Sequence, residues 1–111
     1  NRNAFSLIGV DIIITGELPD DPATAVGYTR IIREASTNAV KHGHAKRVTV
    51  DIIEDDKGRT LRVSNDGVAA SERIRFGTGL PGMNETAKAL GASLTVTSYN
   101  PFTIVVKQKF Q

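Results

Sequence analysis

Cysteine is absent from the 111 residues, and histidine occurs only twice. Without cysteine there is no disulfide scaffold, no thiolate zinc site and no cysteine nucleophile, and the composition suits a reducing compartment. Hydrophobic residues make up 40% of the chain, and a chain of this length buries a core large enough to fold without disulfides or a structural metal. We therefore expect one domain over residues 1–111 with one site.

Excess charge of one sign and long apolar runs are also missing. The formal net charge is only +2, and the single dense basic cluster, residues 41–47, contains both histidines and a glycine. This pattern predicts no nucleic-acid partner. No apolar run approaches the roughly 20 residues that a bilayer requires, and residues 1–3 do not resemble a signal peptide. We expect a cytoplasmic domain without membrane contact, excised from a longer parent that could itself be membrane-anchored.

The first half of the chain predicts one strand and one long helix. Residues 10–15 form a β-branched run between two glycines and indicate a strand, whereas residues 1–8 are interpreted as the end of a preceding helix. Asp21 followed by Pro22 is typical of a helix start. The helix is predicted over residues 23–42, with Gly43 as its left-handed cap. Its apolar positions with helical spacing are Val26, Ile31, Ile32, Ala35, Ala39 and Val40.

The second half predicts a hairpin, a loop, a second helix and two more strands. Residues 47–53 and 60–64 are expected to pair antiparallel, with Val48, Val50 and Ile52 on one face. A polar loop over 68–78 precedes a helix at about 80–90 that Gly91 caps. Strands are predicted at 93–98 and 102–110, with a turn at residues 100–101. This order indicates an α/β (α+β) sandwich, in which a mixed sheet carries helices on one face.

Three polar residues recur every fourth position near the end of the long helix. Glu34, Asn38 and His42 form a ridge about 12 Å long, with Lys41 beside its end. An amide oxygen such as that of Asn38 suits Mg²⁺. This ion takes few protein ligands when phosphates and waters occupy its other coordination positions. Glu34 could bind a metal-bound water or orient a phosphate acceptor. The alternative is an ordinary solvated helix face.

Two glycine-containing segments follow. Asn65-Asp66-Gly67 ends a strand and, taken alone, is an ordinary turn signal. Residues 77–83 read Gly-Thr-Gly-Leu-Pro-Gly-Met and open a helix. Glycine lets the backbone approach a ligand closely, and the unpaired N–H groups at a helix start favour phosphate. The segment matches neither the Walker pattern nor the dinucleotide-binding pattern.

The three features in this order resemble the ATP-binding catalytic domain of sensor histidine kinases. Residues 34–42 (EASTNAVKH) resemble the N box, Asn65-Asp66-Gly67 resembles the D-x-G adenine box, and residues 77–83 resemble the second glycine box, G-x-G-L-x-G-M. The similarity extends from about residue 9 to 110. The short interval between the glycine boxes looks most like the nitrate-sensor and lipid-sensor subgroup, which has a curtailed ATP lid.

The resemblance implies the Bergerat fold, with a mixed, mostly antiparallel sheet, and Mg-ATP as the ligand. It implies that Asn38 is the Mg²⁺ ligand and that Glu34 is the catalytic residue near the γ-phosphate, with Lys41 and His42 as phosphate neighbours. Thr103 would correspond to the threonine behind the adenine pocket. The implied ATP-binding residues are Asn38, Lys41, His42, Asn65, Gly67, Gly77, Thr78, Gly79, Leu80, Gly82, Met83 and Thr103.

The chain departs from the family pattern around the adenine box. Asn65 stands where the family has an aspartate, Ala69 replaces the second glycine, and Phe102 replaces the glycine before the threonine. An amide oxygen still accepts a hydrogen bond from adenine, but the NH₂ end can donate instead. The neighbouring Asp66 could substitute for the carboxylate, although its side chain should leave the strand on the opposite face. We expect Asn65→Asp to tighten selectivity for adenine.

The implied activity is transfer of the γ-phosphate to a histidine on a separate dimerisation domain, followed by signalling to a response regulator. His42 is then expected to stay in the phosphate site rather than act as the acceptor, and His44 is expected at the surface. Two alternatives remain open. The first is a serine kinase of the anti-sigma-factor type, whose N box is very similar. The second is a nucleotide-binding regulatory module with weak or no turnover.

Overall fold

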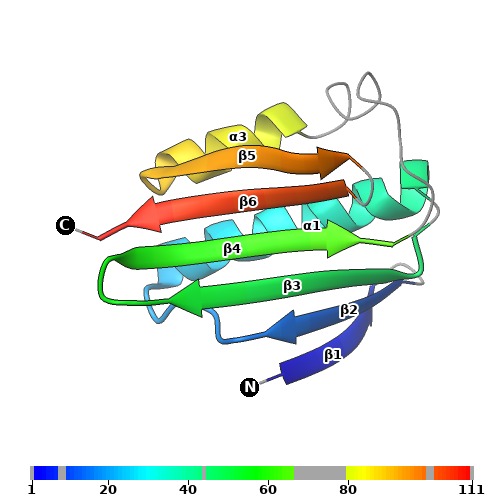
Figure 1. The fold of residues 1–111 in the computed structure, drawn as a ribbon, viewed down its shortest axis with the longest axis horizontal. Helices are drawn as coiled ribbons and strands as arrows, with labels where there is room; N and C mark the ends of the chain where they lie inside the picture. Colours follow the sequence, from blue (N-terminus) through cyan, green and yellow to red (C-terminus); the bar gives the residue numbers. More distant parts are fainter. Residues whose placement is uncertain (1, 8–9, 44, 67–79, 100–101, 111) are drawn as a thin grey trace.

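Six strands and two helices make up the described part of the chain (Figure 1). The computed structural model describes residues 2–7, 10–43, 45–66, 80–99 and 102–110. The helices are α1 (Pro22–Gly43) and α3 (Leu80–Ala89). The strands are β1 (Arg2–Leu7), β2 (Val10–Thr15), β3 (Arg47–Glu54), β4 (Gly58–Asn65), β5 (Ala92–Tyr99) and β6 (Phe102–Lys109).

The strands form one mixed sheet in the order β1-β2-β3-β4-β6-β5. Only β2 and β3 pair in parallel, with Ile12 opposite Val48, whereas the other four pairs are antiparallel. A parallel pair needs a long crossover, which α1 supplies between β2 and β3. The predicted mixed, mostly antiparallel sheet is therefore confirmed. The last strand, β6, lies between β4 and β5.

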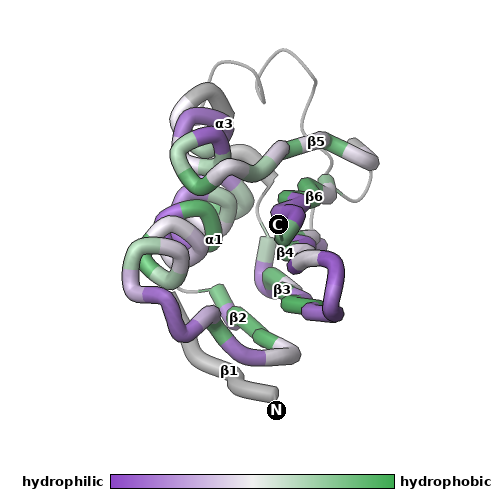
Figure 2. The backbone as a smooth tube through the Cα atoms, turned by 90° about the vertical axis from the view of Figure 1, so that its left-hand side faces the viewer, coloured by the Kyte–Doolittle hydropathy of each residue, from purple (hydrophilic) through white to green (hydrophobic). Residues whose placement is uncertain are grey.

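Both helices pack on the same face of the sheet and give the molecule two layers (Figure 2). They approach each other closely at Gly27 of α1, where a Cβ atom would lie 2.6 Å from Cδ1 of Leu90. Along the described chain, neither helix is long and apolar enough to cross a membrane. The predicted sandwich with helices on one face is confirmed.

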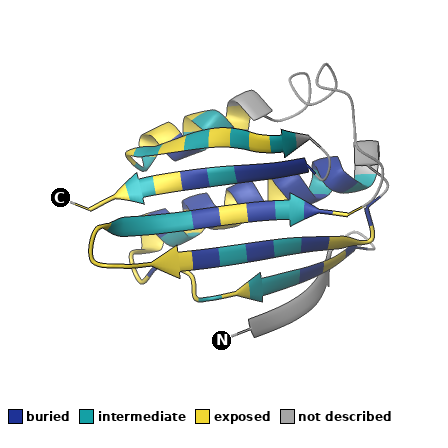
Figure 3. Ribbon diagram, in the orientation of Figure 1, coloured by how far each residue is buried: buried dark blue, intermediate teal, exposed yellow. Residues whose placement is uncertain are grey.

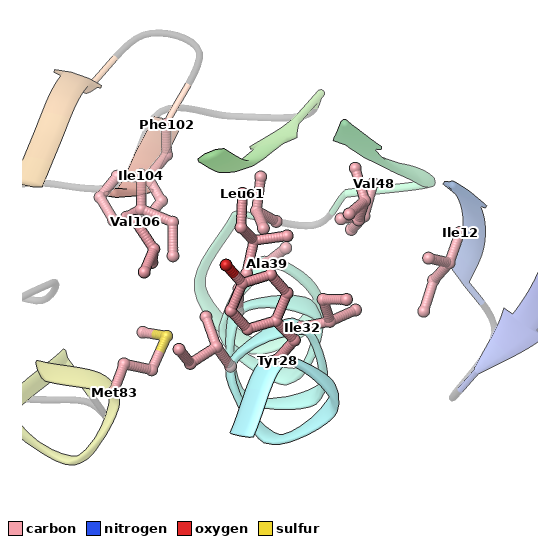
Figure 4. Close-up of a cluster of buried hydrophobic side chains, with 14 of the residues drawn as sticks. Ile12, Tyr28, Ile32, Ala39, Val48, Leu61, Met83, Phe102, Ile104 and Val106 are labelled. Carbon is pink, nitrogen blue, oxygen red and sulfur yellow. The ribbon is translucent and has the colours of Figure 1, made fainter. Parts of the chain in front are cut away.

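The core is formed by buried side chains from the helices and the sheet, and buried residues alternate with more exposed ones along the central strands (Figure 3). Hydrophobic side chains from α1 contact those of the sheet (Figure 4). Burial of this apolar surface is the main stabilising contribution to the fold. On β3 the predicted inward face of Val48, Val50 and Ile52 is buried. The largest fully buried side chains are Tyr28, Ile12, Ile31, Leu61, Met83 and Ile104.

Gln108 on β6 ties both helices to the sheet at the end where β6 finishes. Its Nε2 donates to the carbonyl of Leu90, just after α3, at 3.1 Å. Its Oε1 accepts from the hydroxyl of Tyr28 on α1 at 3.3 Å and from Arg59 on β4 at 3.1 Å. Burial raises the pKa of the Tyr28 hydroxyl, which therefore stays protonated and can donate. These bonds fix α1 and α3 relative to the central strands.

Two predictions about the first part of the chain are wrong. Residues 2–7 form an edge strand rather than the end of a helix, because they pair antiparallel with β2, with Leu7 opposite Val10. On α1, Val26 was expected in the core but is 59% exposed, and Tyr28 is buried there instead. Tyr28 lies three and four residues before Ile31 and Ile32, which is the spacing of one helix face, whereas Val26 lies on another face.

Helix ends otherwise follow the sequence signals. The predicted cap at Asp21 is confirmed, because its Oδ2 accepts from the amide of Thr24 at 2.9 Å and from the hydroxyl of Thr24 at 2.6 Å. Gly91 follows α3 with φ +71° and supplies the predicted left-handed end. α1 ends at Gly43, one residue beyond the predicted end at 42, so that the predicted cap residue is part of the helix. Beyond it the amide of Ala45 donates to the carbonyl of Ala39 at 3.0 Å.

Asp21→Ala is expected to lower the melting temperature near neutral pH and to have less effect in acid. The two hydrogen bonds from Thr24 hold the pKa of the Asp21 carboxyl below its ordinary value of 3.8. The carboxylate therefore stabilises the fold above about pH 4, and this contribution is lost as the pH falls through the lower folded-state pKa. Thermal unfolding of both proteins at pH 7 and pH 3 tests this. A difference that does not shrink in acid would contradict it, and Asp20→Ala is the matched control.

Candidate functional site

The sequence features singled out above meet at one end of the sandwich. Figure 1 places the end of α1, the end of β4, the start of α3 and the start of β6 together on the right. Asn38 lies on the last two turns of α1, Asn65 is the last residue of β4, and Met83 lies in the first turn of α3. The fold thus gathers parts of all three motifs at one edge.

The polar ridge on α1 is not a uniformly solvated face. Asn38 is 8% exposed and lies on the side of the helix that packs on the sheet, whereas Glu34, one turn earlier, is exposed. Burying an amide is unfavourable unless polar interactions compensate, and Asn38 does take part in an interaction of that general kind. The alternative of an ordinary solvated helix face therefore does not hold for Asn38.

A hollow of about 260 Å³ between α1 and α3 brings the N box and the second glycine box together. Glu34 lines it from α1, and Gly82 and Met83 line it from the first turn of α3. The hydroxyl of Thr86 donates to the carbonyl of Gly82 at 3.1 Å and reinforces this turn. The carboxylate of Glu34 is therefore open to solvent directly beside the start of α3.

Sequence reasoning missed three residues of this hollow. Arg30 and Arg33 line it from α1, and Thr86 lines it from α3. The signal was present for Arg30, which precedes Glu34 by four residues and so lies on the same side of the helix. The two guanidinium groups give the rim of the hollow a positive potential beside the Glu34 carboxylate.

The side chains of Asn65 and Asp66, at the end of β4, point in different directions and have different surroundings. Asn65 is 7% exposed and faces the helix layer, in step with Leu61 and Val63. The Oδ1 of Asp66 accepts from the backbone amides of Lys46 and Arg47, both at 2.9 Å. Asp66 thereby fastens the start of β3 to the end of β4. Its carboxylate is engaged there, which argues against Asp66 as a substitute for the missing aspartate.

Thr103 is not brought together with Asn65 and Asn38. It pairs with Ser64 across β4 and β6, and the two hydroxyl oxygens are 3.0 Å apart. Because side chains alternate along a strand, Thr103 lies on the face away from the helices. The inward position belongs to Phe102, which is buried in the core with Ile104 (Figure 4). This placement does not fit the threonine role that the resemblance implies.

Part of the predicted site lies outside the described residues. These positions are Gly67, Ala69, Gly77, Thr78 and Gly79, together with His44 and the turn at residues 100–101. For Lys41, His42 and Leu80 the structure describes the helical backbone but not the side chain. Their predicted contacts with nucleotide remain predictions.

The described donor groups fit a Mg²⁺ ion that takes most of its ligands from a bound triphosphate and water. In the described ranges no three His, Cys, Asp or Glu residues cluster as a metal site, so an ion held by protein alone is not indicated there. Mg²⁺ usually binds through one or two protein oxygens. The amide of Asn38, at the inner side of the ridge, and the carboxylate of Glu34 one turn away supply this kind of set.

Known proteins resemble the chain in sequence and in fold. The family model described as "Histidine kinase-, DNA gyrase B-, and HSP90-like ATPase" matches residues 23–110. The chain is 39% identical over 71 residues to the sensor histidine kinase DesK of Bacillus subtilis, covering 62% of this chain. It is 33% identical over 72 residues to the sensor histidine kinase YxjM of the same organism, covering 65% of this chain.

The matched relatives are much longer proteins. The chain spans 19% of DesK and 18% of YxjM, about a fifth of each. Among solved structures, it resembles the ATP binding domain of PrrB from Mycobacterium tuberculosis, with a TM-score of 0.62 and 22% identity over 95% of this chain and 77% of that one. A blue-light activated histidine kinase of Erythrobacter litoralis gives a TM-score of 0.71 at 20% identity, covering 90% of this chain and 35% of that one. These structures support the fold.

Proposed function

Because the chain belongs to the family of histidine kinase-, DNA gyrase B- and HSP90-like ATPases, we propose that it binds Mg-ATP and donates the γ-phosphate to a histidine. The acceptor would lie on a separate dimerisation domain of a longer, cytoplasmic or membrane-anchored sensor kinase that signals to a response regulator. The observation that supports this most is the hollow in which Glu34 of α1 faces the first turn of α3. One catalytic carboxylate is exposed there beside a helix start suited to phosphate.

Phosphoryl transfer requires mainly that the γ-phosphate is placed in line and that its charge is neutralised. In this proposal Asn38 holds the metal-bound triphosphate from the buried side of the ridge, and Glu34 meets the acceptor from the exposed side. Mg²⁺, when bound, would supply charge neutralisation on the phosphate oxygens. The rim residues Arg30 and Arg33 add positive charge near the same position.

The remaining predicted residues keep their roles in the proposal. Lys41 and His42, at the end of α1, would contact phosphate oxygens, and Leu80, Gly82 and Met83 would shape the phosphate-facing helix start. Met83 is 1% exposed and anchors that turn in the core. The glycine-containing segment Gly77-Thr78-Gly79, with Gly67, would form the short lid.

Titration of the domain with ATP, with and without Mg²⁺, tests the binding part of the proposal. We expect Mg²⁺ to raise the affinity for ATP by about tenfold or more, because the ion, when bound, would neutralise charge on the triphosphate and Asn38 would help to hold it. Equal affinities in the presence and absence of Mg²⁺ would contradict the metal role.

Phosphotransfer in trans tests the kinase part. The domain, loaded with γ-labelled ATP, is mixed with the dimerisation domain of its parent, and the phosphorylated residue is identified by its acid lability. An acid-labile phosphohistidine is expected. An acid-stable phosphoserine on a partner would support a serine kinase, and tight binding without any transfer would support a regulatory module.

A further inference from the structure

The solvent side of α1 carries one apolar and two basic side chains in a row. Val26 is 59% exposed, and Arg30 and Arg33 are exposed as well. The two arginines follow Val26 by four and seven residues, which is the spacing of one side of a helix. All three line a hollow of about 320 Å³, together with Ala25 and Thr29. We call Val26, Arg30 and Arg33 the basic face of α1.

The basic face of α1 leads directly to the proposed catalytic carboxylate. Arg30 and Arg33 also line the hollow of about 260 Å³ that contains Glu34, so the two hollows meet at these arginines. Val26 precedes Glu34 by eight residues, which is about 12 Å along a helix. A protein that brings a histidine to Glu34 therefore meets the two guanidinium groups at the rim. A contact surface that extends two helical turns further covers Val26.

The charges of this face favour a partner with acidic side chains. Like charges one turn apart on a helix repel each other, and a carboxylate placed against Arg30 and Arg33 removes that repulsion and accepts hydrogen bonds from the guanidinium groups. A single exposed valine is ordinary, but Val26 shares one hollow with both arginines. Arginine beside an apolar side chain is a combination suited to a protein–protein contact.

We propose that the basic face of α1 is the docking surface for the phosphoacceptor domain. That domain presents acidic side chains to Arg30 and Arg33 and an apolar side chain to Val26 while its histidine reaches Glu34. The proposal rests on the proposed kinase function and adds which surface recognises the acceptor and by what chemistry. Because complementary charges determine specificity and the rate of association, acceptor domains without acidic residues at this contact are poor substrates.

The test is an NMR titration of the nucleotide-free domain with the dimerisation domain of its parent, whose acceptor histidine is replaced by glutamine so that only binding is measured. Backbone amide signals of residues 25–34 are expected to shift. The double variant Arg30→Glu, Arg33→Glu should bind about tenfold or more weakly, because attraction becomes repulsion. Raising the salt from about 50 to 500 mM should weaken binding of wild type more than that of the double variant.

Val26→Glu separates acceptor docking from nucleotide binding. It sets a carboxylate against the acidic partner and should weaken acceptor binding about fivefold or more. The affinity for Mg-ATP should stay within about twofold, because Val26 lies about 12 Å from Glu34 along the helix. Lys107→Glu is the matched control: Lys107 is exposed on β6 and pairs with Thr60, on the face of the sheet away from α1. It should bind the acceptor as wild type does, and circular dichroism confirms that each variant is folded.

Charge exchange identifies the partner residues. Replacing single acidic residues of the acceptor domain by arginine should restore binding to Arg30→Glu in at least one case. Unchanged acceptor affinity of the double arginine variant, or amide shifts confined to other surfaces, would overturn the docking surface. So would a double variant that loses only affinity for ATP, since the arginines would then serve the nucleotide. Wild type that docks the acceptor as described but transfers no phosphate from Mg-ATP would instead contradict the proposed function.

Discussion

Glu34→Gln is expected to reduce phosphotransfer by about 100-fold or more, because positioned acid or base groups contribute about that much. The affinity for Mg-ATP should stay within about twofold, since glutamine keeps the shape of the side chain. The carboxylate is exposed in the hollow beside Gly82 and Met83, where an incoming acceptor can reach it. The measurement is the single-turnover rate of transfer to the added dimerisation domain, with affinity determined separately.

Glu85→Gln on α3 is the matched control for this change. Glu85 lies on α3 and is also exposed. It lines a separate groove between α1 and α3, and not the hollow that contains Glu34. Its removal should leave the transfer rate unchanged. If Glu34→Gln and Glu85→Gln transferred phosphate equally fast, the catalytic role of Glu34 would be excluded.

Asn38→Ala is expected to abolish the part of ATP affinity that depends on Mg²⁺. The amide of Asn38 is buried on the sheet side of α1, where it is the described oxygen donor best suited to a metal-bound triphosphate. The variant should bind ATP equally with and without Mg²⁺, whereas Mg²⁺ should raise the ATP affinity of wild type by about tenfold or more. Removing one hydrogen-bonding side chain costs about 1 kcal/mol of stability, so the fold should remain intact.

Thr37→Ala provides the comparison for Asn38→Ala. Thr37 is the adjacent residue, and its hydroxyl donates to the carbonyl of Arg33 within the helix at 2.9 Å. This substitution should leave the Mg²⁺ dependence as in wild type. Calorimetric titrations that showed unchanged Mg-ATP affinity for Asn38→Ala would rule out the assigned role of the ridge.

The elements that local signals define could be predicted from the sequence. α1 was expected at residues 23–42 and spans Pro22–Gly43, because Asp21, the apolar spacing and Gly43 all agree. The strand at Val10–Thr15 was predicted with both of its ends. These predictions succeed because capping and periodicity depend on neighbours within one or two turns.

Features that depend on distant partners could not be predicted. β1 is stabilised by pairing with β2, and nothing within residues 2–7 alone distinguishes this edge strand from a helix end. Thr103 was aligned with a family threonine, but the register of β6 on β4 sets it opposite Ser64 and turns it away from the helices. A shift of one residue in a strand exchanges the two faces.

The orientation of Asn65 is a further case. The sequence shows an amide where the family has a carboxylate, but it does not show which end of the amide faces a ligand. That depends on the hydrogen bond to the carbonyl of Asp66. Likewise, the engagement of Asp66 with the start of β3 required the pairing of β3 with β4, since Lys46 and Arg47 lie about 20 residues earlier in the chain.

The position of β6 inside the sheet has a consequence for how the domain is made. β4 and β5 are joined only through β6, which bonds to both. A nascent chain that has been synthesised only as far as β5 therefore has β1 to β4 on one side and the single strand β5 on the other, with no strand between them. The sheet becomes continuous when Phe102–Lys109 inserts between β4 and β5. The edge that carries the three motifs is therefore complete only after β6 has been synthesised.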